Sequence, residues 1–88
     1  MTAYVVTVGS AENEPPAEAL RFPGEAVALG PRLFVCETEA SQSRLYHDVK
    51  AQLPKDTPLF VGALADEPKF KGMADGSTKA VRRIFGKR

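Results

Sequence analysis

Four side chains between positions 36 and 47 have the chemistry that an active site needs. Glu37 and Glu39 alternate at the end of a predicted strand, so their carboxylates share one face, which is the minimum geometry for holding Mg²⁺. His47 follows the apolar helical position Leu45 by two residues, which predicts a solvated side chain rather than a general base. Cys36 ends an apolar run, as a small buried hydrophobe does. Glu37, Glu39 and His47 are therefore the only candidate residues for a metal-dependent enzyme, and the family resemblance given below would make that enzyme a nuclease, the second alternative to a binding function.

The sequence lacks the motifs of the common enzyme classes. It contains no Gly-rich phosphate loop with Lys-Ser/Thr, no G-x-S-x-G and no H-E-x-x-H. One Cys and one His exclude a disulfide framework and a zinc finger. The sequence therefore predicts a non-enzymatic protein without a cofactor or a bound metal.

Charge divides the chain into two unequal parts. Residues 1–68 hold ten acidic and five basic side chains, whereas residues 69–88 hold one acidic and seven basic side chains, so the near-neutral total conceals a dipolar chain. The basic part could bind RNA or DNA by neutralising phosphates, through Lys79, Arg82, Arg83, Lys87 and Arg88. The other interpretation is that these cations favour the end of a helix and pair with the acidic part of the same chain. Nucleic-acid binding is thus the first alternative function.

The elements that carry these residues fit one small α+β domain. Hydrophobic content of 43% and charged content of 26% are ordinary globular values, and 88 residues build only a thin core. Apolar and β-branched runs predict strands over residues 3–8, 25–29, 32–38 and 59–64. Ser41 is placed to cap a helix that Pro54 ends, and its buried stripe is Leu45, Val49 and Leu53.

The order of the predicted elements indicates a ferredoxin-like fold. Prolines and glycines leave room for only a short helix within residues 11–24, so the order is βαββαβ, with two helices on one face of a four-stranded antiparallel sheet. A last helix is predicted from Ser77 or Thr78 to Gly86. Residues 1–68 form the predicted core, and residues 69–88 form a basic C-terminal segment that packs on the core or on a partner subunit.

Three pieces of the sequence resemble the SinR-like small proteins, which are related to the smaller, nuclease-like protein of CRISPR spacer acquisition. The pieces are YVVTV at residues 4–8, LFVCET at residues 33–38 with its Ser-capped helix, and LFVGAL at residues 59–64 with FKGM and the terminal helix. The resemblance implies a ferredoxin-like domain that is often dimeric, in which the segment after the last strand reaches a partner subunit.

The departures from this family favour binding over catalysis. The nuclease-like relatives carry a metal-binding acid at the end of the first strand, where this sequence has Val8-Gly9-Ser10. The first helix region is also shortened, so we expect one side of the sheet to stay uncovered and to expose an apolar patch that another protein can bind. The candidate interface residues are Phe60, Phe70, Met73 and Phe85.

These observations together predict a small accessory protein that acts through protein–protein contacts. We expect a homodimer with a further protein partner. We expect it in the cytoplasm, because no apolar run is long enough to span a membrane and the N-terminus has no signal-peptide pattern. A composition with 12 Ala but one Ile and one Asn is typical of a GC-rich genome, such as that of an actinobacterium or its phage.

Overall fold

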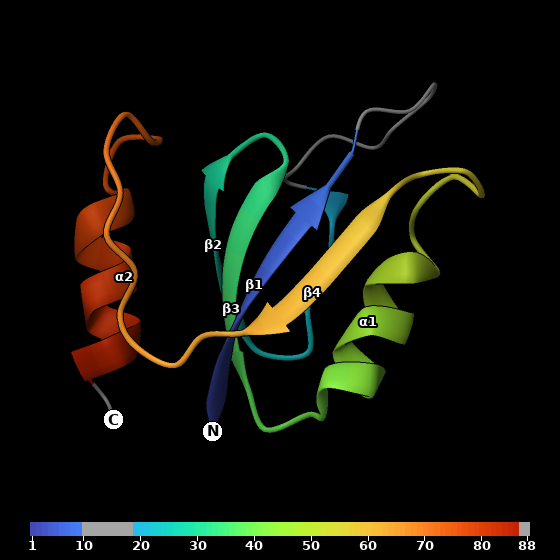
Figure 1. Ribbon diagram of the computed structural model, residues 1–88, viewed down its shortest axis with the longest axis horizontal. Coiled ribbons are helices and arrows are strands. Elements are labelled where there is room, and N and C mark those ends of the chain that lie inside the picture. Colours follow the sequence, from blue (N-terminus) through green and yellow to red (C-terminus); the bar gives the residue numbers. More distant parts are fainter. Residues whose placement is uncertain (10–18, 87–88) are drawn as a thin grey trace.

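A four-stranded antiparallel sheet forms the centre of the molecule (Figure 1). The computed structural model describes residues 1–9 and 19–86. In chain order its elements are β1 (Thr2–Val8), β2 (Glu25–Gly30), β3 (Leu33–Thr38), α1 (Gln42–Lys50), β4 (Leu59–Ala63) and α2 (Ser77–Gly86). The strands lie in the order β2-β3-β1-β4, so β1 and β3 are central and β2 and β4 are the edges of the described sheet. Every pair of neighbours is antiparallel.

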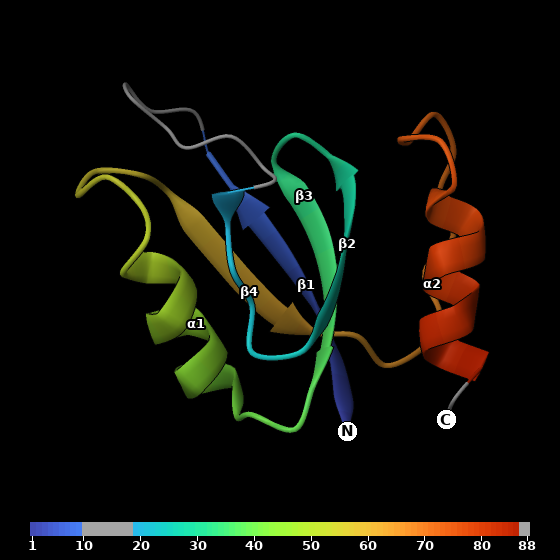
Figure 2. The ribbon, with the colours of Figure 1, turned by 180° about the vertical axis from the view of Figure 1, so that it is seen from behind.

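Alternation of side chains along the strands supplies two apolar clusters, one on each face of the sheet. On one face, Tyr4, Val6, Phe34 and Cys36 pack against the buried stripe of α1. On the other face, buried residues of β2 and β3 pack against α2 through Leu29, Val35, Val81 and Ile84. Figures 1 and 2 accordingly show α1 and α2 on opposite sides of the sheet.

Helix α1 begins where its sequence predicts and ends earlier. The Ser41 side chain accepts a hydrogen bond from the backbone N–H of Arg44 at 3.1 Å, which confirms the predicted cap. The helix ends at Lys50 rather than Leu53, and the chain closes with a tighter turn in which the Leu53 N–H donates to the Lys50 carbonyl at 3.1 Å. Pro54 explains why no helical bond closes on Lys50 from four residues later, because proline has no N–H and its ring clashes with that carbonyl.

Of the two helices predicted on one face of the sheet, the described residues show only α1, and residues 20–24 form no α-helix. Helix α2, which was predicted in addition to that pair, lies on the opposite face. The rest of the predicted first helix lies outside the described residues. Leu20 and Phe22 nevertheless pack against the α1 cluster, and the Phe22 ring lies 5.2 Å from that of Phe34 between centroids. This extended segment therefore covers part of the face on which a helix was expected.

Helix α2 is fixed on the sheet by apolar residues and by the turn that precedes it. Gly76 has a φ of 83°, a left-handed conformation that favours glycine, and the Ser77 hydroxyl donates to the Ala74 carbonyl at 2.6 Å. Ala74 in turn donates its N–H to the Leu29 carbonyl of β2 at 2.8 Å. Helix α2 thus packs on the sheet of its own chain. None of the helices in the described part of the chain is both long and apolar enough to cross a membrane.

Candidate functional site

The carboxylates at the end of β3 do not assemble a metal site in the described part of the chain. Glu37 is only 3% exposed and its Oε2 has no hydrogen-bond partner, whereas Glu39 is exposed. Glu25 lies directly opposite Glu37 on β2 and binds Arg83 of α2. Among residues 1–9 and 19–86, no three His, Cys, Asp or Glu side chains are grouped so that they could hold a metal ion.

Cys36 lies inside the core of the α1 face and has no accessible surface. Burial raises the pKa of its thiol to about 11, and the charge of neighbouring Glu37 adds to the effect. A cysteine with so high a pKa carries almost no thiolate at neutral pH, and the thiolate is the nucleophilic form. Cys36 is therefore a packing residue, as the sequence predicted.

His47 is exposed on α1, as expected from its position outside the apolar stripe. Its ring meets the edge of the Tyr46 ring at 5.2 Å between centroids. The neighbouring carboxylate of Asp48 binds Arg44 one turn earlier, at 3.2 Å, and does not orient the histidine. The arrangement lacks the oriented histidine that general-base chemistry uses.

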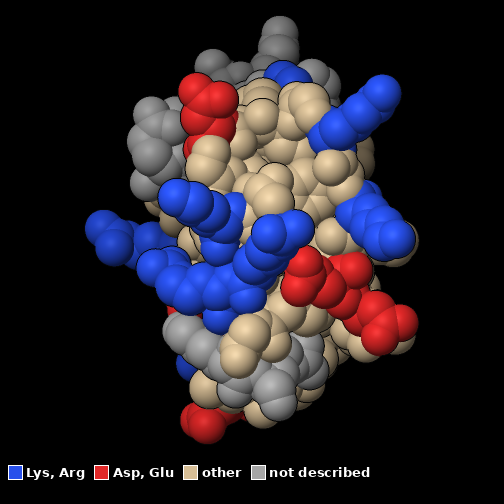
Figure 3. All heavy atoms as spheres, turned by 90° about the vertical axis from the view of Figure 1, so that its left-hand side faces the viewer, with Lys and Arg blue, Asp and Glu red and all other residues tan. Residues whose placement is uncertain are grey.

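Arginines and lysines gather over α2 and form a basic surface (Figure 3). Acidic side chains lie beside it, and two of the predicted phosphate-binding residues contact such carboxylates: Arg83 binds Glu25, and Arg82 lies 4.0 Å from Glu67. Both arginines stay largely exposed, with 64% and 74% of the side-chain surface accessible, so these pairs are weak. Lys79 is also exposed. Lys87 and Arg88 lie outside the described residues.

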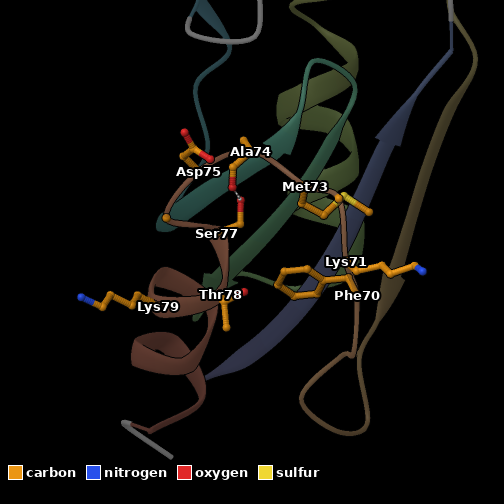
Figure 4. A pocket seen from close by; sticks show the side chains of 10 residues that line it. Phe70, Lys71, Met73, Ala74, Asp75, Ser77, Thr78 and Lys79 are labelled. Carbon is orange, nitrogen blue, oxygen red and sulfur yellow. Dashed lines mark hydrogen bonds between the residues drawn. The ribbon is translucent and has the colours of Figure 1, made fainter.

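The hollow at the start of α2 brings few groups together (Figure 4). It has a volume of about 500 Å³ and lies between α2 and the segment from Phe70 to Gly76. The ring of Phe70 points toward Thr78, but Lys71 and Lys79 extend away from the hollow in opposite directions (Figure 4). The Ser77 hydroxyl already donates to the Ala74 carbonyl. Without converging polar groups, the hollow lacks the pattern of a small-molecule site.

Phe60 is the most exposed of the candidate interface residues. It is 60% exposed on β4, whereas Phe70 and Phe85 pack against the α2 cluster and Met73 is 37% exposed. The strand alternation directs Leu59 and Val61 into the α1 cluster and Phe60 to the opposite face. There the ring leans along its own strand, with Cε1 3.2 Å from where a Cβ on Gly62 would lie.

Around Phe60, the described residues leave this sheet face partly exposed. Thr7, which is paired with Phe60, and Val5, which is paired with Gly62, are only partly buried. Helix α2 packs over β2 and β3 at the other side of this face. We call the surface formed by Val5, Thr7, Phe60 and Gly62 the β4 surface. The sequence identified Phe60 but not this surface, because LFVGA looks like a strand buried on both faces.

Comparison with known proteins gives no relative: no protein-family model, curated protein sequence or solved structure matches this chain.

Proposed function

We propose that this protein is a ferredoxin-like domain of the SinR-like type with a shortened first helix region. Two features support the proposal. Strands β1 and β2 are both antiparallel to β3, which lies between them, and β3 and β4 are likewise separated by β1. In the βαββαβ arrangement, the two strands of each βαβ unit are separated in the sheet by a strand of the other unit. Here β1 and β2 form the first pair, and β3 and β4, connected by α1, form the second. Helix α2 is then an addition that covers part of the opposite face.

We further propose that the protein is a non-enzymatic binding module, and that its partner is a protein held on the β4 surface. The observation that carries the proposal is the exposure of Phe60, an aromatic ring that is 60% accessible beside partly buried Val5. Aromatic residues that bury large areas dominate the energy of protein interfaces. The uncharged strand around Phe60 suits such a contact, because charged residues are depleted at interface cores.

Replacing Phe60 by Thr tests this function. Threonine keeps the strand propensity and removes the ring, so the fold should be retained. Immobilised wild-type and Phe60→Thr proteins are exposed to the same bacterial lysate at low protein concentration. We expect at least one protein to be retained by the wild type and lost from the variant. Retention of the same proteins by both chains, with equal free energies of unfolding, would overturn the proposal.

Nucleic-acid binding through α2 is a second candidate function, favoured by the exposed Lys79, Arg82 and Arg83. These cations are weakly paired with carboxylates, which a nucleic acid would have to displace. Retention on single- and double-stranded DNA and RNA at low salt, lost at higher salt, would support this function. The Lys79→Ala/Arg82→Ala variant should then lose retention while its free energy of unfolding stays unchanged. The absence of retention at low salt would remove the candidate.

A further inference from the structure

We infer that the outer edge of β4 pairs with the same edge of a second copy of this chain, antiparallel and centred on Val61. This inference rests on the proposed binding function and names its partner. It begins with the directions of the backbone groups. Leu64 donates its N–H to the Ala3 carbonyl of β1 at 2.8 Å, and Gly9 donates to the Pro58 carbonyl at 2.8 Å. Because these directions alternate along a strand, the backbone N–H and C=O groups of Leu59, Val61 and Ala63 point away from β1, toward the outer edge.

The outer edge of β4 lacks the protection that isolated edge strands usually carry. Residues 57–65 contain no charged side chain, and no proline follows position 58 in this stretch. The other edge, β2, has a register shift between Ala28 and Gly30, and the Ala74 N–H covers its Leu29 carbonyl. Bulges, covering loops and charges are the devices by which proteins protect edges. Within the described residues, the β2 edge carries two of these devices, whereas the β4 edge is met by the Gln42 side chain alone.

One outward group of β4 shows that this edge accepts a donor from outside the sheet. The side-chain amide of Gln42 donates to the Val61 carbonyl at 2.9 Å. A carbonyl oxygen has two lone pairs, so Val61 can accept a second hydrogen bond from a paired strand. Beside this carbonyl, Ser41, Gln42, Ser43, Tyr46 and Val61 line a hollow of about 470 Å³ between α1 and β4.

The residues of β4 are complementary to themselves, and this favours a second copy as the occupant. Antiparallel pairing centred on Val61 places Leu59 opposite Ala63 and Phe60 opposite Gly62. Because each Phe60 ring leans over Gly62 of its own strand, the two exposed rings would lie on the same face of the paired strands and bury each other. No like charges oppose each other within the strand, so nothing in this register repels.

Amide hydrogen exchange of the purified protein at micromolar and millimolar concentration tests the pairing within a single strand. The outward amides of Leu59, Val61 and Ala63 should become at least about tenfold more protected at the higher concentration. The inward amides of Phe60 and Gly62, which face β1, should be protected at both concentrations and serve as the control. Equal protection of the outward amides at both concentrations overturns the inference.

Ala63→Pro provides the matching variant. Proline removes the outward N–H of an exposed residue and is tolerated on an edge strand, whereas Ala63→Val keeps the N–H. Two symmetry-related bonds are lost, so we expect the dimer dissociation constant to rise at least about tenfold for Ala63→Pro and to change little for Ala63→Val. Equal dissociation constants for the two variants overturn edge pairing. A chain that retains another protein through Phe60 but stays monomeric keeps the proposed function and overturns this inference.

Discussion

Truncation of Ile84 to Ala tests whether α2 is part of the folded core. Its side chain has no accessible surface and packs with Val81 against Leu29 and Val35. The change removes three carbon atoms, each worth about 0.8 kcal/mol of burial, and it leaves a cavity. Because the site lies under a single helix that can partly close the cavity, we expect a loss of about 3 kcal/mol in the free energy of unfolding, within the range of about 2 to 5 kcal/mol for such changes.

Urea unfolding followed by circular dichroism measures this loss. A domain of this size has a total stability of only about 4 to 13 kcal/mol, so the shift in the unfolding midpoint should be large. Lys79→Ala, at an exposed position of the same helix, is the control and should change the stability by no more than about 0.5 kcal/mol. A loss below about 1 kcal/mol for Ile84→Ala would refute the packing of α2 on its own sheet.

Three further predictions concern a thiol, a glycine and an ion pair. The pKa of Cys36 rises from 9.0 to about 11 on folding, so its contribution to the free energy of unfolding is complete below pH 9 and is lost as the pH rises toward 11. The free energy of unfolding of Cys36→Ala, measured over the same pH range, should lack this decline. Gly24→Ala should cost about 1 to 3 kcal/mol in urea unfolding, since the new Cβ would overlap a backbone carbonyl of β3. Gly30→Ala, with open space around the new Cβ, should cost less than Gly24→Ala, and equal costs would contradict the geometry. Arg83→Gln breaks the exposed pair with Glu25 and should lower stability by at most about 1 kcal/mol, an effect that added salt should diminish.

The local structure could be predicted from the sequence where one physical signal dominates. Strands appear at all four predicted places because runs of β-branched and apolar residues pack well on a pleated, half-buried sheet. The Ser41 cap and the buried pair Leu45 and Val49 follow from capping chemistry and helical spacing. Val81 and Ile84 follow the same spacing on the buried side of α2.

The arrangement of these elements depended on information that local patterns do not contain. The pattern of α2 shows which of its sides is apolar but not which face of the sheet it covers. Arg83 meets Glu25, which is far away in the sequence, so the weak pairing of the basic surface follows only from the folded chain. The exposure of Phe60 also follows only from the folded chain. An uncharged strand is expected to be buried until the elements that pack on each face of the sheet are known.

Sedimentation equilibrium over a concentration series tests most directly the claim that the protein binds through β4 rather than through α2. The measurement compares wild type, Phe60→Thr and Lys79→Ala/Arg82→Ala. We predict a reversible dimer for the wild type, a dissociation constant at least about tenfold higher for Phe60→Thr, and little change for the double variant. A wild type that is monomeric at every concentration would contradict self-association through β4, and self-association that only the double variant weakens would place the contact on α2 instead.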